Sequence, residues 1–191
     1  MCINDKTIIL ASASPRRAAF LRELGVAFTV MPADIDEESV RCAAAEETVK
    51  KIALEKARRV FERTNGAVLA ADSAVVLGGE IFGKPKNAED AKRMLRLLSG
   101  RAHEVMTGVA FLSAGKTVNE CVTTKVFFNA LGEEFISSYV AGGSPLDKAG
   151  AYGIQDGGLV EKIEGSYTNV VGLPMELVRE LFKKEGFLTE E

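Results

Sequence analysis

Short apolar runs rich in β-branched residues alternate along this chain with segments whose apolar positions recur every three or four residues. Residues 7–11 form a run of the first kind, and residues 46–63 a segment of the second. Strand and helix patterns that alternate in this way favour an α/β or α+β fold over a helical bundle or a β-sandwich. The 191 residues match the length of one domain, so we expect a single domain over residues 1–191.

The same patterns, read with capping and turn residues, predict the order of the elements. Strands are predicted over residues 7–11, 26–31, 67–77, 80–82, 103–112 and 117–128. Helices are predicted over residues 15–24, 46–63, 88–98 and 133–140, with a last helix that begins at Pro174. Residues 34–38 are expected to form an acidic loop, and residues 142–158 a glycine-rich stretch.

Composition argues against several classes of function. The net charge of −3 is unlike that of a nucleic-acid-binding protein. No apolar run approaches the ~18 residues that a membrane-spanning helix needs. Three widely spaced cysteines and one histidine exclude a zinc site of Cys and His, and they fit a reducing compartment. Because the N-terminus also shows no secretion signal, we expect a cytoplasmic protein without nucleic-acid or membrane partners.

Ser14-Pro15-Arg16-Arg17 follows the first predicted strand and carries the signals of a helix start. Unpaired backbone N–H groups and the helix dipole favour an anion at such a position. The Ser14 hydroxyl and the two guanidinium groups would add charge-assisted hydrogen bonds to phosphate oxygens. The alternative is an ordinary capped helix whose arginines extend into solvent.

Lys56 and Asp72 are charged residues at positions where the patterns predict burial. Lys56 lies in the apolar stripe of the helix over residues 46–63, and Asp72 in the middle of the apolar strand over residues 67–77. A buried carboxylate is costly unless a cation, a metal or a donor pairs with it, so Asp72 is a candidate functional residue. Lys56 has either a similar role or a side chain that reaches solvent at the edge of the core.

Acidic residues dominate positions 23–47, and basic residues dominate positions 48–63. An acidic loop beside basic groups suits a polyphosphate with bound magnesium, although a charge run is more often a solvated surface. In the glycine-rich segment, Gln155 offers a donor and an acceptor for the edge of a base, and the alternative is a flexible loop.

Residues 78–84 match GxxxxGK, the first seven positions of a P-loop. We reject that interpretation because Pro85 replaces the Ser or Thr whose hydroxyl binds magnesium. Gly78-Gly79 predicts instead a two-residue hairpin loop, in which Ser73 would lie opposite Lys84 with Asp72 next to it.

Together these motifs resemble the Maf family of nucleoside triphosphate pyrophosphatases over nearly the whole chain. The resemblance is carried by residues 10–17, 35–37, 53–57, 71–73, 83–85, 98–103, 148–155 and 163–174. It implies an elongated two-lobed α/β fold, similar to inosine triphosphatase, with a mixed twisted sheet flanked by helices and a central cleft. It also implies a homodimer that hydrolyses a nucleoside triphosphate to its monophosphate and pyrophosphate with Mg²⁺ or Mn²⁺.

The resemblance assigns Asp72 the role of general base by its position. Because the chain has one histidine, we expect His103 to be a supporting residue rather than a catalyst. Because Asp36 stands where the family commonly has Glu, contact with the metal would shift to Glu37. The implied catalytic residues are Asp72, Lys56, Lys84 and Glu37, the metal ligands Asp36, Glu37 and Asp72, and the substrate-binding residues Ser14, Arg16, Arg17, Ser73 and Gln155.

Base preference is implied by Arg16, Ser73 and Gln155. The subgroup that selects dTTP and UTP typically has Arg, Thr and Gln at these positions, whereas the 7-methyl-GTP subgroup has an aromatic residue, Gln and Glu. Ser73 departs from Thr by one methyl group, and the other two positions match the pyrimidine subgroup. A hypothesis from another class is a nucleotide-binding regulator of cell division whose hydrolysis is incidental or absent.

Overall fold

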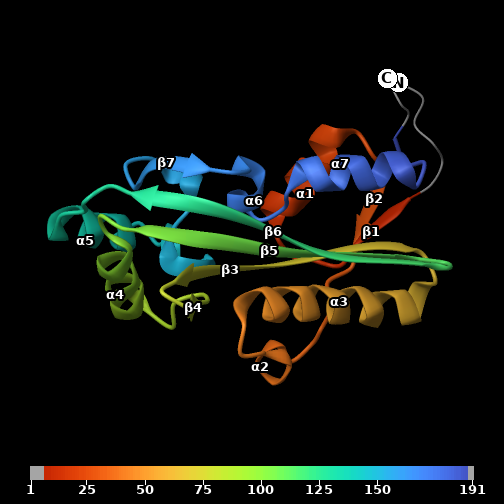
Figure 1. Ribbon diagram of the computed structural model, residues 1–191, viewed down its shortest axis with the longest axis horizontal. Helices are drawn as coiled ribbons and strands as arrows, with labels where there is room; N and C mark the ends of the chain where they lie inside the picture. The colour runs from red at the N-terminus through yellow and green to blue at the C-terminus, as the bar shows by residue number, and fades with distance from the viewer. Residues whose placement is uncertain (1–6, 189–191) are drawn as a thin grey trace. The chain divides into compact units, whose positions relative to one another are not determined.

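The computed structural model describes residues 7–188, and their strands form one mixed sheet (Figure 1). The strands are β1 (Ile8–Leu10), β2 (Phe28–Val30), β3 (Ala67–Leu77), β4 (Glu80–Phe82), β5 (Ala102–Ser113), β6 (Lys116–Phe128) and β7 (Val160–Glu164). Their order is β2-β1-β3-β5-β6-β7, and β4 pairs with β3. β1 is parallel to β2 and β3, whereas β4 and β7 are antiparallel to their partners. The α/β prediction is confirmed.

The helices are α1 (Pro15–Leu24), α2 (Glu37–Val40), α3 (Ala45–Thr64), α4 (Ala88–Leu98), α5 (Glu133–Ala141), α6 (Tyr167–Val171) and α7 (Met175–Lys184). Three short 3-10 helices lie between α5 and β7: η1 (Ser144–Asp147), η2 (Ala149–Ala151) and η3 (Ile154–Asp156). Within the described residues, no helix is both long enough and apolar enough to cross a membrane.

The chain forms two compact units. The first unit contains the described residues up to Asp72, residues Thr107–Val122 and the described residues from Gly172 onward. The second unit contains Ser73–Met106 and Thr123–Val171. The strands β3, β5 and β6 each contribute residues to both units.

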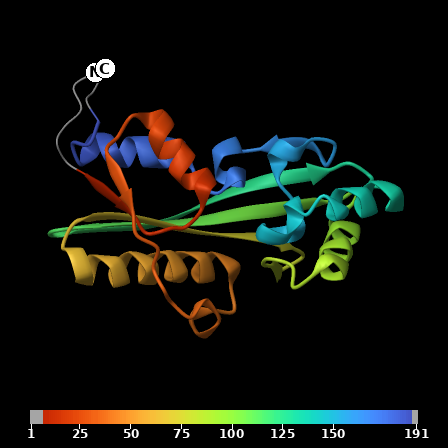
Figure 2. The same ribbon diagram turned by 180° about the vertical axis from the view of Figure 1, so that it is seen from behind.

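In the first unit, helices cover both faces of the sheet. Leu69 and Ala71 of β3 belong to an apolar cluster with residues of α1 and α7. Val68 and Ala70 belong to a second cluster with residues of α3. Figures 1 and 2 show α3 on the opposite face from α1 and α7. Successive side chains of β3 therefore point to opposite faces, as the two-residue period of a strand requires.

Small residues let α3 lie close to the sheet. Ala53 and Ala57 of α3 pack with Ala110 of β5 in the second cluster. A Cβ atom at Gly108 of β5 would lie 2.3 Å from the carbonyl oxygen of Val49, which no side chain tolerates. The backbone of α3 thus approaches the sheet more closely than larger residues would allow.

The second unit has its own core, built from β3 to β7 with α4 and α5. Asn87 caps α4 through a hydrogen bond from the backbone N–H of Asp90 at 2.9 Å, as predicted. Leu77 lies opposite Glu80 in the β3–β4 pair, which confirms the hairpin around Gly78-Gly79 and the rejection of a P-loop.

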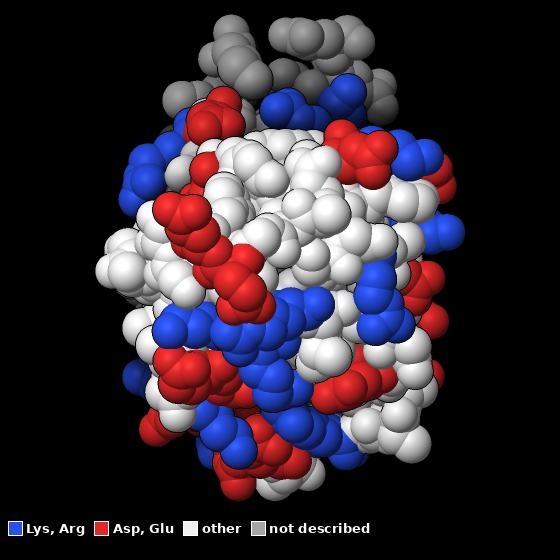
Figure 3. All heavy atoms as spheres, turned by 90° about the vertical axis from the view of Figure 1, so that its left-hand side faces the viewer, with Lys and Arg blue, Asp and Glu red and all other residues white. Residues whose placement is uncertain are grey.

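Figure 3 views the end of the second unit that carries α4 and α5, where basic and acidic side chains are interspersed. Arg96 of α4 forms an ion pair with Glu133 of α5 at 2.7 Å. Within α4, Lys92 and Arg93 pair with Glu89 and Asp90. These charges are therefore largely compensated by their neighbours on the surface.

Three predictions of local structure were incomplete. The predicted acidic loop becomes α2 from Glu37 onward, because Asp36 caps the helix by accepting hydrogen bonds from the N–H groups of Glu38 and Ser39. The glycine-rich stretch contains η1, η2 and η3, whose three or four residues are too few for a periodic signal. Neither β7 nor α6 was predicted, and each spans five residues.

Candidate functional site

The loop between β1 and α1 places two serine hydroxyls at the start of α1. Ser14 is the N-cap residue, and its Oγ accepts a hydrogen bond from the backbone N–H of Arg17 at 3.5 Å. The buried Ser12 accepts one from the backbone N–H of Ser14 at 3.2 Å. With Pro15 in the first turn, this is the capped helix start that the sequence predicted.

Arg17 is held in a fixed orientation by two acceptors. Its Nη1 donates to Ser12 Oγ at 3.0 Å, and its Nε donates to the carbonyl oxygen of Gly172 at 2.8 Å. Burial lowers the pKa of the Arg17 guanidinium, and the negative charges of Asp72 and Glu37 partly offset that effect. An arginine pKa starts so high that the group stays charged, so a partly buried positive charge interacts with two carboxylates.

Lys56 joins those two carboxylates. Its ammonium lies 2.9 Å from Asp72 Oδ1 and 2.7 Å from Glu37 Oε1. The side chains of Lys56 and Asp72 are 12% and 16% exposed, whereas Glu37 is 53% exposed. The charges of the two partly buried groups compensate each other, and the more exposed Glu37 adds a second contact to Lys56.

The local sequence explains why these groups meet. Val68 and Ala70 of β3 face α3, so Asp72, two residues further along the strand, points to the same face. Lys56 lies between Ala53 and Ala57, which pack on that face of the sheet. The close approach of α3 therefore brings the lysine stem to the strand and its ammonium to Asp72.

These carboxylates fit a divalent cation when judged by their donor atoms. Glu37 and Asp72 each place an oxygen within 2.9 Å of one position, which the Lys56 ammonium marks. Within residues 7–188, no group of three or more His, Cys, Asp or Glu side chains could hold a metal. Magnesium is commonly held by one or two carboxylates together with waters and substrate phosphates, so a pair suffices. Asp36, the third predicted ligand, caps α2.

Arg16, a predicted substrate-binding residue of the first unit, is the second residue of α1. The three other predicted site residues, Ser73, Lys84 and Gln155, belong to the second unit. Ser73 directly follows Asp72 in β3, the exposed Lys84 follows β4, and the exposed Gln155 is the central residue of η3. The N–H of Gly150 donates to the carbonyl oxygen of Gly83 at 3.0 Å. That bond ties the segment that leads to Gln155 to the neighbour of Lys84.

His103 lies in the core of the second unit and is 2% exposed. Its Nε2 is 2.8 Å from the Tyr152 hydroxyl, and the rings of Tyr152 and Phe128 contact it edge-on. Burial lowers the pKa of His103 to about 4, so the ring is neutral at pH 7. It is a packing element of this core rather than a proton carrier at neutral pH.

Sequence reasoning missed three contributors to these groups of residues. Ser12 orients Arg17, and its place two residues before the capping Ser14 was the available signal. The Gly172 carbonyl is 155 positions from Arg17, and no local pattern reveals such a contact. Tyr139 was predicted only as part of a helix, yet its hydroxyl contacts η3 on both sides of Gln155.

The fold and the residues of the first unit define an α/β protein with a helix start suited to anions beside a lysine that bridges two carboxylates. Its fold is shared with the solved Ham1 protein of Staphylococcus aureus, which aligns with a TM-score of 0.58 at 18% identity and covers 94% of this chain and 100% of that chain.

The chain belongs to the Maf family, because the model of that family, described as Maf-like protein, matches residues 7–185. It is 51% identical over 178 residues to a dTTP/UTP pyrophosphatase of Citrifermentans bemidjiense, covering 91% of this chain and 92% of the relative. It is 48% identical over 186 residues to a dTTP/UTP pyrophosphatase of Anaeromyxobacter dehalogenans, covering 94% of each chain.

Proposed function

We propose that this protein is a nucleoside triphosphate pyrophosphatase that hydrolyses dTTP and UTP to the monophosphate and pyrophosphate. Membership of the Maf family and relatives about half identical in sequence that carry this name support the reaction class. The observation that carries the proposal is the bridge from Lys56 to Asp72 and Glu37, close to the start of α1. Such an arrangement can bind a polyphosphate and activate water in one place.

Phosphate binding falls to the start of α1. The backbone N–H groups of the first turn and the Ser14 hydroxyl can donate hydrogen bonds to phosphate oxygens. The positive end of the helix dipole favours an anion at the same place. Arg17 supports this positive potential from a fixed orientation, since Ser12 and Gly172 hold its guanidinium. Arg16 adds a second guanidinium to the same turn, and Lys84 is the further lysine that the family pattern assigns to the polyphosphate.

Asp72 is the proposed general base. It takes a proton from a water molecule whose oxygen attacks the α-phosphorus. The bond from that phosphorus to the bridging oxygen breaks, and pyrophosphate leaves with the electron pair. Lys56 orients the Asp72 carboxylate through the 2.9 Å contact and offsets the negative charge of the substrate.

We propose Glu37 and Asp72 as the residues that hold a divalent cation, Mg²⁺ or Mn²⁺. Such an ion, when bound, polarises phosphate oxygens and lowers the pKa of a bound water. Asp36 contributes by capping α2 and so fixing the position of Glu37. Asp36 is therefore proposed to position the ligand Glu37 and not to bind the metal itself.

Base selection is assigned to Arg16, Ser73 and Gln155. Uracil and thymine present an N3–H donor beside the C4 carbonyl acceptor. The Gln155 amide can match that pair with its oxygen and its NH₂ group. A glutamate at this position would instead accept from two donors, as a guanine edge requires.

The experiment is an assay of pyrophosphate release from dTTP, UTP, CTP and 7-methyl-GTP with Mg²⁺ or Mn²⁺. We expect dTTP and UTP to be hydrolysed fastest, with one pyrophosphate for each monophosphate. Release of orthophosphate would indicate a phosphatase. Preference for 7-methyl-GTP would assign the protein to the 7-methyl-GTP subgroup of the Maf family. No release from any nucleotide would contradict the enzymatic proposal.

The same assay addresses the alternative of a nucleotide-binding regulator of cell division. Replacing Lys56 with alanine should remove turnover, so a cellular phenotype that persists in that variant would favour the regulator. We also propose a cytoplasmic homodimer, on the basis of the cysteine pattern and the family resemblance. Light scattering in solution tests the dimer, and a mass equal to one chain of 20.5 kDa would contradict it.

A further inference from the structure

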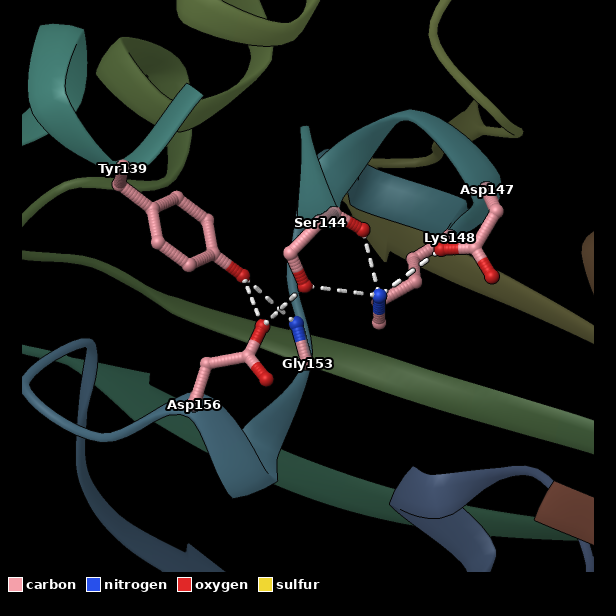
Figure 4. Close-up of polar contacts among 6 residues, drawn as sticks. All are labelled: Tyr139, Ser144, Asp147, Lys148, Gly153 and Asp156. Carbon is pink, nitrogen blue, oxygen red and sulfur yellow. Dashed lines mark hydrogen bonds and ion pairs between the residues drawn. The ribbon is translucent and has the colours of Figure 1, made fainter. Parts of the chain in front are cut away.

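One tyrosine hydroxyl spans the turn that carries Gln155. Tyr139 of α5 donates a hydrogen bond to Asp156 Oδ2 at 2.5 Å and accepts one from the backbone N–H of Gly153 at 3.1 Å (Figure 4). Gly153 precedes η3, and Asp156 is its last residue. The residues on both sides of Ile154-Gln155 are therefore tied to the same oxygen atom.

The turn itself has little intrinsic order. η3 is a three-residue 3-10 helix in which the N–H of Asp156 donates to the carbonyl oxygen of Gly153 at 3.1 Å. Gly157 and Gly158 follow, both with positive φ. Short 3-10 helices have poor hydrogen-bond geometry, and glycines lose the most backbone entropy on ordering. The position of Gln155 therefore depends on contacts from outside the turn.

Further contacts reinforce the tyrosine. Ser144 Oγ donates to the same Asp156 Oδ2 at 3.1 Å, and Lys148 Nζ donates to Ser144 Oγ at 3.1 Å (Figure 4). The Tyr139 ring stacks on that of Phe135, with ring planes 9° apart, which fixes the direction of the hydroxyl. Burial and the bond to Asp156 raise the pKa of Tyr139, so it remains a donor at neutral pH.

Gly153 is a glycine for reasons of space. Its φ of −115° is one that any residue adopts. A Cβ atom there would lie 2.9 Å from Asp156 Oδ2 and 3.1 Å from the Cε of Lys148. A side chain at Gly153 would thus push the Asp156 carboxylate away from Tyr139. The contact between Tyr139 and Asp156 therefore also depends on the absence of a side chain at Gly153.

We propose that Tyr139 is a positioning residue for base selection, which acts by holding the turn that presents Gln155. This inference rests on the proposed role of Gln155 in reading the base. The amide of Gln155 presents one donor and one acceptor. If the amide is rotated so that the two exchange places, it matches the edge of cytosine instead of that of uracil. A turn held on both sides restricts the amide to one arrangement, whereas a loosened turn allows both.

The test compares Tyr139→Phe with wild-type full-length protein. The substitution keeps the stacked ring and removes the hydroxyl. We expect the ratio of kcat/KM for UTP over CTP to fall about tenfold, the effect of losing one hydrogen-bonding group. We expect the kcat for UTP and the inhibition constant of pyrophosphate to change less than about twofold, since the loss is confined to base recognition.

Tyr167→Phe is the matched control, because Tyr167 is 46% exposed and the chemical change is identical. Its UTP over CTP ratio should equal that of the wild type. Asp156→Ala removes the acceptor of the Tyr139 hydroxyl and should lower the ratio as Tyr139→Phe does. The double variant should lose less than the sum of the two single variants, because both single variants break the contact between Tyr139 and Asp156.

Three outcomes would overturn the inference, and Gln155→Glu distinguishes the first two. If Gln155→Glu changes base preference but Tyr139→Phe leaves the ratio intact, the role of Tyr139 fails while the proposed function stands. If Gln155→Glu leaves the base preference unchanged, the base-reading role and the inference fail together. An equal loss of kcat on every nucleotide in Tyr139→Phe, with weaker pyrophosphate inhibition, would reveal a purely structural role.

Discussion

The two units present their candidate functional residues in different ways. In the first unit, Lys56 and Asp72 lie on a long helix and a long strand, and close packing at Gly108 brings them together. In the second unit, Gln155 lies on a three-residue helix that side-chain contacts hold in place. Sites on regular elements are held more precisely than sites on turns. The proposed general base and the lysine that orients it thus lie on rigid elements. Gln155, which is proposed to read the edge of the base, lies on a turn that can change without disturbing a core.

Among the substitutions that test this difference between the two units, Lys56→Ala should lower activity the most. It removes the ammonium that bridges Glu37 and Asp72, so two carboxylates repel each other where the substrate also brings negative charge. We expect kcat to fall by about 100-fold or more on every nucleotide. Lys50→Ala is the control, since Lys50 lies on the same helix and pairs only distantly with Glu46, at 4.0 Å. A loss that differed strongly between bases would contradict the division between the units.

Acid should destabilise the second unit through His103. Its pKa is about 4 in the folded protein and about 6.5 in the unfolded chain, so the unfolded chain binds more protons between these values. Stability is therefore lost as pH falls from about 6.5 towards 4, by up to about 3 kcal/mol. Urea unfolding at several pH values measures the effect, and His103→Gln should flatten the pH dependence in this window. An unchanged pH profile in the variant would assign the acid sensitivity to other groups.

Gly108→Ala should destabilise the first unit, because the new methyl group would collide with the backbone of α3 at Val49. We expect a loss of about 2 kcal/mol in the free energy of unfolding, the usual cost of overpacking. Gly132→Ala is the control, since a Cβ atom there would meet nothing within 4 Å. Equal stability of the two variants would show that α3 can move away from the sheet at little cost.

Ser73→Thr should have the smallest effect. It adds the methyl group that the pyrimidine subgroup of the Maf family typically carries at this position. One buried methyl group contributes roughly 0.8 kcal/mol, so kcat/KM for dTTP should change by about fourfold at most. Steady-state kinetics on dTTP and UTP measure this change. A loss of activity as large as that of Lys56→Ala would show that the serine does more than contact the base.

Most long elements could be predicted because they repeat a period. β3 and β4 have the predicted boundaries, and α4 begins after the predicted cap at Asn87. The glycine-rich stretch shows the limit, since η1, η2 and η3 are held by contacts such as that between Tyr139 and Asp156. Such contacts depend on tertiary structure, which local sequence does not specify.

The candidate site was predictable in residue type but not in geometry. An aspartate in an apolar strand required a partner, whereas the lysine in an apolar stripe had either a similar role or a side chain that reaches solvent. The structure pairs Lys56 with Asp72. The resemblance to the Maf family implied that Glu37 belongs with them, but no local pattern indicates its contact with Lys56, because that contact depends on the helix that Asp36 caps. Tertiary packing determines which charged residues meet, whereas burial patterns indicate only that they must.

The most direct test of the central claim compares Asp72→Asn with Gln155→Glu across dTTP, UTP, CTP and 7-methyl-GTP, with pyrophosphate release as the readout. Asp72→Asn removes the proposed base and should lower kcat by about 1,000-fold on every nucleotide. Gln155→Glu should retain turnover and shift preference away from dTTP and UTP. Equal losses on all nucleotides from Gln155→Glu, or turnover retained by Asp72→Asn, would contradict the account.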